Sequence, residues 1–316
     1  MPKPTAIVTG GAGFIGSHLV DALIADDCPV VVIDDLSTGE ARRVTDRASL
    51  EVIDITDREQ LGRAVDKVRP SVFFHLAAQS SVTRSVADPE ADCRINVLGT
   101  LNILEAATRH AANVVFSSTG GALYGDRAPL PTPEESTPAP ISPYGASKWA
   151  GEAYVTTWRE ATGLPHAVCR LGNVYGPRQS PHGEAGVVAI FSHQLWRGEA
   201  PTLYGQGEAT RDYVHVHDVA RALIAAASAQ GTFNISTGVE TPVSEIFDVL
   251  QREARTTVRP ENAPLRPGEL ERSCLDPSRA GRELQWRAEI GLEEGLARTF
   301  HALVEEFESD TRLAAG

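Results

Sequence analysis

Short apolar runs and amphipathic stretches alternate along the first half of the chain. The apolar runs are rich in β-branched residues and end in small or polar residues, as buried parallel strands do. They cover residues 5–10, 29–34, 50–55, 71–77 and 113–118. Between them, segments such as 17–27 and 58–68 have the spacing of amphipathic helices. This alternation predicts βαβ units, and therefore an α/β fold with a Rossmann-like, doubly wound parallel sheet.

The pattern changes after residue 177, where loop-rich segments begin. Residues 166–176 predict a further strand, and residues 215–229 and 231–236 predict one more helix and strand of the sheet. The tail combines Pro/Gly loops with helical segments at 242–254 and 291–308.

These segments predict two domains. We expect residues 1–177 and about 213–237 to form the dinucleotide-binding domain. Residues of about 178–212 and 238–316 then form a smaller, mixed C-terminal substrate domain.

Composition narrows the range of partners. The 316 residues include 29 Lys and Arg against 42 Asp and Glu, a formal charge of −13, which argues against nucleic acid or an anionic membrane. The four cysteines are far apart and show no metal-binding spacing, so we expect free thiols and no metal. No segment reads as a signal peptide or a bilayer span, which favours a cytoplasmic protein.

A glycine-rich turn follows the first predicted strand in "TGGAGFIG", residues 9–16. Gly10 allows the tight turn, Gly13 lets the backbone approach a pyrophosphate, and Gly16 lets helix and strand pack closely. Phe14 and Ile15 begin a helix whose unpaired N–H groups favour phosphate. This arrangement predicts a dinucleotide cofactor.

Acidic residues end the next two strands. Asp34 lies eighteen residues after Gly16, where a carboxylate accepts hydrogen bonds from the adenosine ribose and repels a 2′-phosphate. Asp34 and its neighbour Asp35 therefore predict NAD as the cofactor. Asp54 and Ile55 end the third strand and are candidates for the adenine edge.

The fourth predicted strand ends in "HLAAQSS". Leu76 and the small residues Ala77 and Ala78 suit a backbone that lies against the cofactor. Asn96, in the following helix, is a further candidate that holds water or backbone near it.

Tyr144 and Lys148 lie four residues apart in "SPYGASK", at a predicted helix start. A lysine one turn along lies on the same helix face. An ammonium ion beside a phenol favours the phenolate, and so lowers the pKa of Tyr144 from about 10 towards a useful range. The fifth strand ends in "SSTGG", where Thr119, and next Ser118, could share a substrate proton with Tyr144.

Together these segments resemble the extended short-chain dehydrogenase/reductase superfamily. The matching segments, in chain order, are TGGAGFIG, DDLSTG, HLAAQ, SSTGG, YGASK and NVYGPR. The segments "NVYGPRQSPHGEAGVVAIF" and "ATRDYVHVHDVA" are most similar to the UDP-glucose 4-epimerase branch of the nucleotide-sugar enzymes.

The resemblance implies a set of substrate-binding residues. Asn173 would contact the phosphate region of the sugar nucleotide and Arg211 its pyrophosphate, while Arg266 and Glu269 would hold phosphate and uridine ribose. Guanidinium groups suit phosphate oxygens and a carboxylate suits a ribose diol. The other implied contacts with the substrate are Arg178, Ser80, Thr119, Tyr144, Val188 and Tyr204.

The implied reaction is NAD-dependent 4-epimerisation of a UDP-hexose, UDP-glucose/UDP-galactose, through a transient 4-keto intermediate. UDP-glucuronate and UDP-N-acetylhexosamine remain alternatives, because the glycines after Thr119 make "SSTGGALYG" one residue longer than the pattern it resembles. A nucleotide-sugar dehydratase or reductase and a non-catalytic NAD-binding regulator are further alternatives. By resemblance alone, the enzyme would be a homodimer through helices near residues 92–111 and 144–162.

Overall fold

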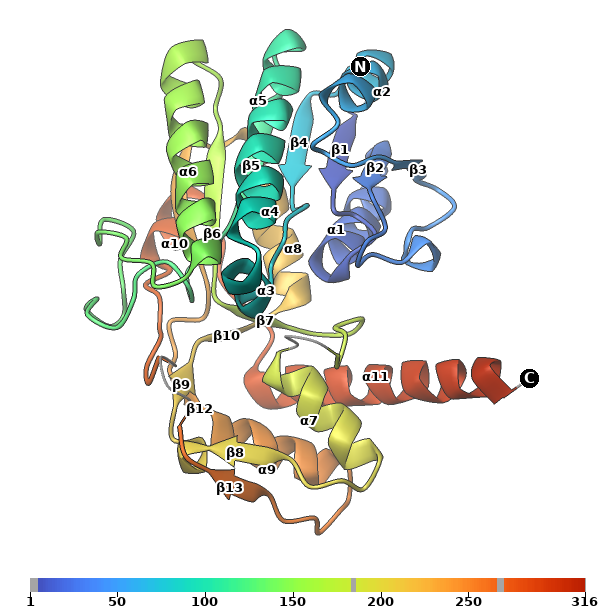
Figure 1. Ribbon diagram of the computed structural model, residues 1–316, viewed down its shortest axis with the longest axis vertical. Helices are drawn as coiled ribbons and strands as arrows, with labels where there is room; N and C mark the ends of the chain where they lie inside the picture. Colours follow the sequence, from blue (N-terminus) through green and yellow to red (C-terminus); the bar gives the residue numbers. More distant parts are fainter. Residues whose placement is uncertain (1–4, 183–185, 266–269, 316) are drawn as a thin grey trace.

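A seven-stranded parallel sheet forms the centre of the computed structural model, which describes residues 5–182, 186–265 and 270–315 (Figure 1). Its strand order is β11-β6-β5-β4-β1-β2-β3, so the chain reverses direction across the sheet between β1 and β4. The strands are β1 Ala6–Thr9, β2 Val30–Asp34, β3 Ser49–Val52, β4 Val72–His75, β5 Asn113–Thr119, β6 Ala167–Leu171 and β11 Gly231–Ile235. The predicted doubly wound fold is confirmed.

Helices cover both faces of this sheet because its side chains alternate between two apolar clusters. Ile7 of β1 points into one cluster, and its neighbours Ala6 and Val8 point into the other. The first cluster is covered by α2 Arg58–Val68, α5 Gly99–Arg109 and α6 Pro143–Thr162. The second is covered by α1 Phe14–Ala25, α8 Val216–Ala225 and α10 Ser278–Glu283.

Short helical segments join β4 to α5. They are α3 Val82–Ala87, α4 Pro89–Cys93 and the π-helix η2 Arg94–Leu98. Single-turn π-helices often mark functional sites. Here the segment leads directly into α5, and Gly99, the first residue of α5, packs against Ile55.

Three helices and three small sheets lie beyond the carboxyl ends of the central strands (Figure 1). The helices α7 Val187–Trp196, α9 Val243–Glu253 and α11 Leu292–Ala315 share a third apolar cluster. The paired strands are β7 Asn173–Tyr175 with β10 Tyr213–His215, β8 Thr202–Tyr204 with β13 Glu261–Ala263, and β9 Thr210–Arg211 with β12 Thr241–Pro242. The exact division of the chain into two domains stays a prediction.

Two strand predictions need correction. Residues 166–176 form two strands, because at Gly172 the backbone N–H still donates to Ile235 O, whereas the next N–H, of Asn173, donates to Asp212 O. The third predicted strand is not buried: β3 is the edge of the sheet, and Val52 is 58% exposed.

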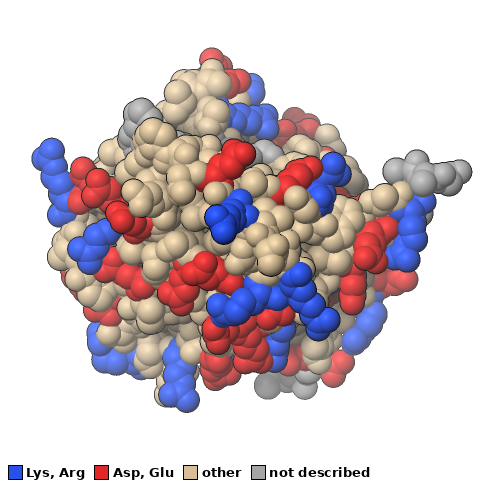
Figure 2. Space-filling view, turned by 90° about the horizontal axis from the view of Figure 1, so that it is seen from below, with Lys and Arg blue, Asp and Glu red and all other residues tan. Residues whose placement is uncertain are grey.

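Charged side chains of both signs lie next to one another on the face shown in Figure 2. The excess of carboxylates is therefore interspersed with basic groups there. Within the described ranges, none of the helices combines the length and apolar character needed to span a membrane.

Four histidines are buried and neutral at physiological pH. Burial lowers the pKa of His75 to about 3 and those of His18, His166 and His215 to about 4. His75 is enclosed by the hydroxyl groups of Thr9 and Thr100, at 2.8 and 3.0 Å. The unfolded chain, whose histidines titrate near 6.5, takes up these protons more readily.

We therefore expect stability to be complete above about pH 6.5 and to fall as the pH drops towards 4. Each buried histidine should lower the free energy of unfolding at pH 5 by on the order of 1 kcal/mol or more. Urea denaturation at pH 7.5 and pH 5 measures the effect. His166→Asn, which retains an acceptor for the Val114 N–H, should reduce the pH dependence, and the exposed His301→Gln should not. Equal stability at the two pH values would contradict this account.

Candidate active site

The glycine-rich turn joins β1 to α1 and lies against the segment that follows β4. Gly10 has a φ of +72°, and a Cβ atom there would lie 2.7 Å from the Ala77 nitrogen. A Cβ at Gly16 would collide with the Gly10 carbonyl oxygen. Gly13 is the N-cap of α1 and has no side chain to cap it, so the first N–H groups, from Phe14 on, are left for a ligand. The loop therefore has the form that a dinucleotide pyrophosphate requires.

Asp34 ends β2 beside this turn. Its Oδ2 accepts a hydrogen bond from Ala12 N at 3.0 Å, and its Oδ1 accepts one from Leu36 N at 2.9 Å. Burial raises the pKa of Asp34 above its ordinary value, while these hydrogen bonds oppose the change. Asp35 instead binds the backbone and hydroxyl of Ser37 at the surface, at 2.9 and 2.7 Å.

The two candidates that follow β3, Asp54 and Ile55, differ in burial: the first is exposed and the second lies in the core. Asp54 is exposed and accepts a hydrogen bond from Thr56 N at 2.8 Å. Ile55 is 4% exposed, and its side chain packs against Gly99. If Ile55 contacts the cofactor, it therefore does so through its backbone atoms.

Asn96 fixes the loop that follows Leu76, Ala77 and Ala78. Its Oδ1 accepts a hydrogen bond from Gln79 N at 2.9 Å, and its Nδ2 donates to Gln79 O at 2.9 Å. The same Nδ2 donates to Ser147 Oγ of α6 at 3.0 Å. Asn96 therefore joins the end of β4 to α6, while Ser80 lies exposed in the loop beyond.

Tyr144 lies in the first turn of α6. Ser142 caps this helix, accepting a hydrogen bond from Gly145 N at 3.2 Å, and Ser85 Oγ accepts one from Tyr144 N at 3.1 Å. The Thr119 hydroxyl accepts a hydrogen bond from Ala122 N at 3.2 Å, and it lies near enough to the phenol to favour its ionised form. The predicted pairing of Thr119 with Tyr144 stays a prediction.

The predicted effect of Lys148 on the phenol is wrong for these side-chain positions. Burial raises the pKa of Tyr144 to about 12, Asp92 raises it further, and Thr119 opposes the rise. The Lys148 ammonium instead donates to Ser117 O at 2.8 Å and lies 4.8 Å from the centre of the Phe116 ring. Burial lowers the pKa of Lys148 to about 8.

Ser118 points elsewhere than expected. Its hydroxyl donates to Glu152 Oε1 at 2.5 Å, and Glu152 forms a buried ion pair with Arg170 at 2.6 Å. Arg170 also donates to the Tyr124 hydroxyl at 2.5 Å. Neighbouring residues on a strand face opposite ways, so Thr119 lies with Tyr144 while Ser118 belongs to this buried network.

The structure places Asn173 near the turn that follows Thr119. A Cβ at Gly121 would lie 3.7 Å from Asn173 Oδ1, so this amide faces the turn. The Asn173 N–H donates to the carbonyl of Asp212, the residue after Arg211, at 2.7 Å. Asp212, which the sequence analysis missed, is 1% exposed and accepts hydrogen bonds from backbone groups of Thr237, Gly238 and Leu275.

The remaining substrate candidates are dispersed. Val188 is 1% exposed and lies in the third apolar cluster, so its side chain serves packing. Arg178 pairs with Asp21 of α1 at 2.7 Å. Tyr204 ends β8 and is partly exposed. Arg266 and Glu269 lie outside the described residues.

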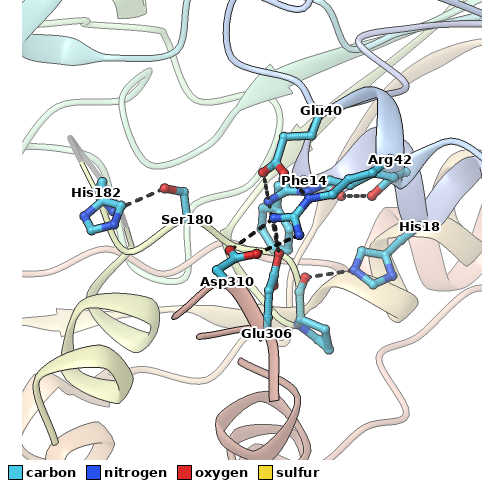
Figure 3. A network of polar contacts seen from close by, with 11 residues as sticks. Phe14, His18, Glu40, Arg42, Ser180, His182, Glu306 and Asp310 are labelled. Carbon is cyan, nitrogen blue, oxygen red and sulfur yellow. Dashed lines mark hydrogen bonds and ion pairs between the residues drawn. The ribbon is translucent and has the colours of Figure 1, made fainter. Parts of the chain in front are cut away.

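A surface ion cluster ties α11 to the loop after β2 (Figure 3). Arg42 contacts Glu40 at 2.5 Å and Asp310 at 2.8 Å, and Glu306 lies within 3.7 Å of its guanidinium. Nearby, His18 of α1 bonds Pro177 O at 2.9 Å. The C-terminal helix thereby contacts the loop that begins at the candidate ribose-binding carboxylate.

Sequence reasoning identified Asn96 but missed Asp92 and Glu152. Asp92, Asn96 and Thr100 are each 1% exposed and recur every four residues along α4, η2 and α5. That polar stripe within an otherwise amphipathic segment is the signal that could have identified Asp92. Glu152, four residues after Lys148, offered a similar signal on α6.

Comparison with known proteins places the chain among nucleotide-sugar enzymes. Residues 6–236 match the model of the NAD dependent epimerase/dehydratase family. A UDP-glucose 4-epimerase of Mycolicibacterium smegmatis is 44% identical over 93% of this chain and 96% of that protein.

Solved structures agree with this placement. The UDP-glucose 4-epimerase of Thermotoga maritima with UDP-glucose is 42% identical, with a TM-score of 0.93 over 96% of this chain and 99% of that one. The enzyme of Thermus thermophilus in complex with NAD is 42% identical, with a TM-score of 0.88 over 95% of this chain and 98% of that one.

The buried network around Glu152 yields a stability prediction. Glu152→Gln should destabilise the fold by about 3–5 kcal/mol, because it leaves the Arg170 charge buried without its carboxylate. Glu160→Gln, which removes the exposed carboxylate beside Arg159 on the same helix, should cost less than about 1 kcal/mol. Urea denaturation compares the two, and equal losses would contradict the buried ion pair.

Proposed function

The chain belongs to the NAD-dependent epimerase/dehydratase family, and from this premise we propose that it is a UDP-hexose 4-epimerase. It interconverts the carbon-4 epimers UDP-glucose and UDP-galactose through a 4-keto sugar. The observation that carries the proposal is the placement of Tyr144 and Lys148 one turn apart on α6, with Thr119 near the phenol, in a fold whose glycine turn has dinucleotide-binding form.

The residues at the glycine turn fit NAD. The close approach of Gly10 to Ala77 and the uncapped start of α1 leave backbone N–H groups for the pyrophosphate, and Asp34 would accept from the adenosine ribose. When bound, NAD supplies the acceptor and donor of hydride at carbon 4 of the sugar.

Tyr144 acts as general base and then general acid on the 4-hydroxyl group. A phenol with a pKa of about 12 does not give up its proton readily, so positive charge must accompany substrate and cofactor binding. Lys148, one helical turn away, would supply part of that charge if its ammonium group turned from Ser117 O towards the phenol. Thr119 shares the proton with the phenol and holds the sugar hydroxyl in line.

The substrate is anchored through its UDP portion. Arg211 would bind the pyrophosphate, and Asn173, which faces Gly121, would contact the phosphate region of the sugar nucleotide. Binding energy from the nucleotide leaves the sugar free to present either face of carbon 4. For Arg178, the ion pair with Asp21 favours a structural role.

A 4,6-dehydratase is the weaker candidate. Elimination of water needs an acid and a base beside the sugar. The two residues after Thr119 are Gly120, which packs against Leu275, and Gly121, which faces Asn173. Neither offers a titratable group.

A panel of UDP-sugars tests the function. The purified protein should interconvert UDP-glucose and UDP-galactose, with the carbon-4 configuration followed by proton NMR. Faster turnover of the glucuronate or N-acetylhexosamine forms would reassign the sugar, and no turnover of any UDP-sugar would contradict the proposal.

Tyr144→Phe should retain NAD, measured after denaturation and release, and lower kcat by about 10²–10⁴-fold.

An exposed apolar surface supports the homodimer. It includes Trp149 and Tyr154 of α6, Leu98 of η2 and Val86 of α3, exposed by 43, 38, 51 and 64%. Such a patch on neighbouring helices fits a second copy of the same surface.

We expect light scattering after size exclusion to give twice the 33.8 kDa chain mass. Trp149→Glu should yield monomers, because it buries a charge at the centre of an apolar interface. Val52→Glu, at the equally exposed edge strand β3, is the control and should leave the dimer intact. A monomeric wild-type protein would rule out this interface.

A further inference from the structure

Asp92 is a buried carboxylate beside the Tyr144–Lys148 pair to which the mechanism gives no role. It lies on α4 and is 1% exposed. Its Oδ1 accepts hydrogen bonds from Gln79 Nε2 at 2.8 Å and from Asn96 Nδ2 at 3.2 Å. Its Oδ2 is buried and has no hydrogen-bond partner within residues 5–182, 186–265 and 270–315. A buried carboxylate so placed requires a nearby positive charge.

Lys148 follows Ser147, which shares the Asn96 amide with Asp92. Its side chain is buried, and its ammonium group makes one hydrogen bond, to Ser117 O, among the described residues. A carbonyl dipole does not neutralise a buried cation. Two carboxylates, Asp92 and Glu152, raise the pKa of Lys148 against the effect of burial. Glu152 is already paired with Arg170, so the charge of Asp92 remains for Lys148.

Asp92 is also connected to the turn that carries the phenol. Asn96 Nδ2 bonds both Asp92 Oδ1 and Ser147 Oγ, and Ser147 Oγ donates to the Tyr144 carbonyl at 3.0 Å. This chain of hydrogen bonds crosses from α4 through η2 to the first turn of α6. A shift of the Asp92 carboxylate would therefore reach the Tyr144 backbone.

We propose that Asp92 is a positioning residue for the catalytic pair: its hydrogen bonds through Asn96 and Ser147 hold the turn of Tyr144, and they place a buried carboxylate where its charge acts on Lys148. This inference rests on the proposed function, in which the phenol takes and returns a proton. The other titratable groups that face the pair are His75 of β4, which is neutral, and Glu152 of α6, which is bound to Arg170 of β6.

The sequence makes the lysine directly observable. Lys3, Lys67 and Lys148 are the three lysines of the chain, so protein labelled with ¹³Cε-lysine gives three resonances. Lys3→Arg and Lys67→Arg assign two of them and leave Lys148. Asp92→Asn retains an oxygen for Gln79 and Asn96 and removes only the charge, so it should lower the pKa of Lys148 by roughly one pH unit.

Asp88→Asn is the matched control. Asp88 caps the same helix, accepting from Ala91 N at 2.9 Å, but is exposed, so its replacement should leave the Lys148 titration unchanged. Asp92→Ser provides the same test if the amide variant does not fold. A Lys148 resonance that titrates at the wild-type pH in the charge-free variant overturns the proposal.

Enzyme kinetics supply a second readout. A negative charge raises the pKa of both Tyr144 and Lys148, so its removal should move both limbs of the kcat/KM profile to lower pH. Lower activity with unmoved limbs would reduce Asp92 to a structural residue. An inactive wild-type protein would refute the proposed function instead, while the lysine titration would still decide the role of Asp92.

Discussion

The bond network of Asn96 is the constraint on which the rest of the site depends. One buried amide satisfies the backbone of Gln79 on both sides and also reaches Ser147 on α6. Buried backbone groups need such partners, because leaving one unpaired costs about 1–3 kcal/mol. The amide therefore sets the position of the loop after β4 and that of the helix carrying Tyr144 together. Since Ala77 of that loop packs closely against Gly10, the glycine-rich turn is positioned by the same loop that Asn96 holds.

Burial gives this site its electrostatic character. It raises the pKa of Tyr144 and lowers that of Lys148, and so opposes the charged form of each. Burial therefore disfavours the ionised pair that proton transfer requires. Asp92 and Glu152 oppose the lowering of the Lys148 pKa, but the effect of burial is larger.

Buried carboxylates also join the parts of the molecule. Glu152 connects β5 and β6 through Ser118 and Arg170, whereas Asp212 gathers the segments at residues 237–238 and 274–275 around the strand that carries Arg211. On the outside, the cluster around Arg42 fastens α11 to the loop after β2. Ion pairs and hydrogen bonds of carboxylate groups thus connect segments of the central sheet domain with segments that lie beyond the carboxyl ends of its strands.

The sequence by itself determined the elements and the chemistry that are local. The alternation of apolar runs predicted the strands of the sheet, and the spacing of Gly10, Gly13 and Gly16 predicted the turn between β1 and α1, because both follow from backbone geometry over a few residues. The pairing of Tyr144 with Lys148 on one helix face was predictable for the same reason. Tertiary structure decided what depends on residues far apart in the chain. It turned Ser118 towards Glu152, broke the strand at Gly172, placed β3 at the exposed edge, and directed Lys148 to the Ser117 carbonyl. It also connected Asp92, through Asn96, to Ser147 of the helix that carries Tyr144 and Lys148. Hydrogen bonds and burial between distant segments fix these positions. The four-residue spacing of Asp92, Asn96 and Thr100 along the chain indicates a buried polar stripe, but not which residues it meets.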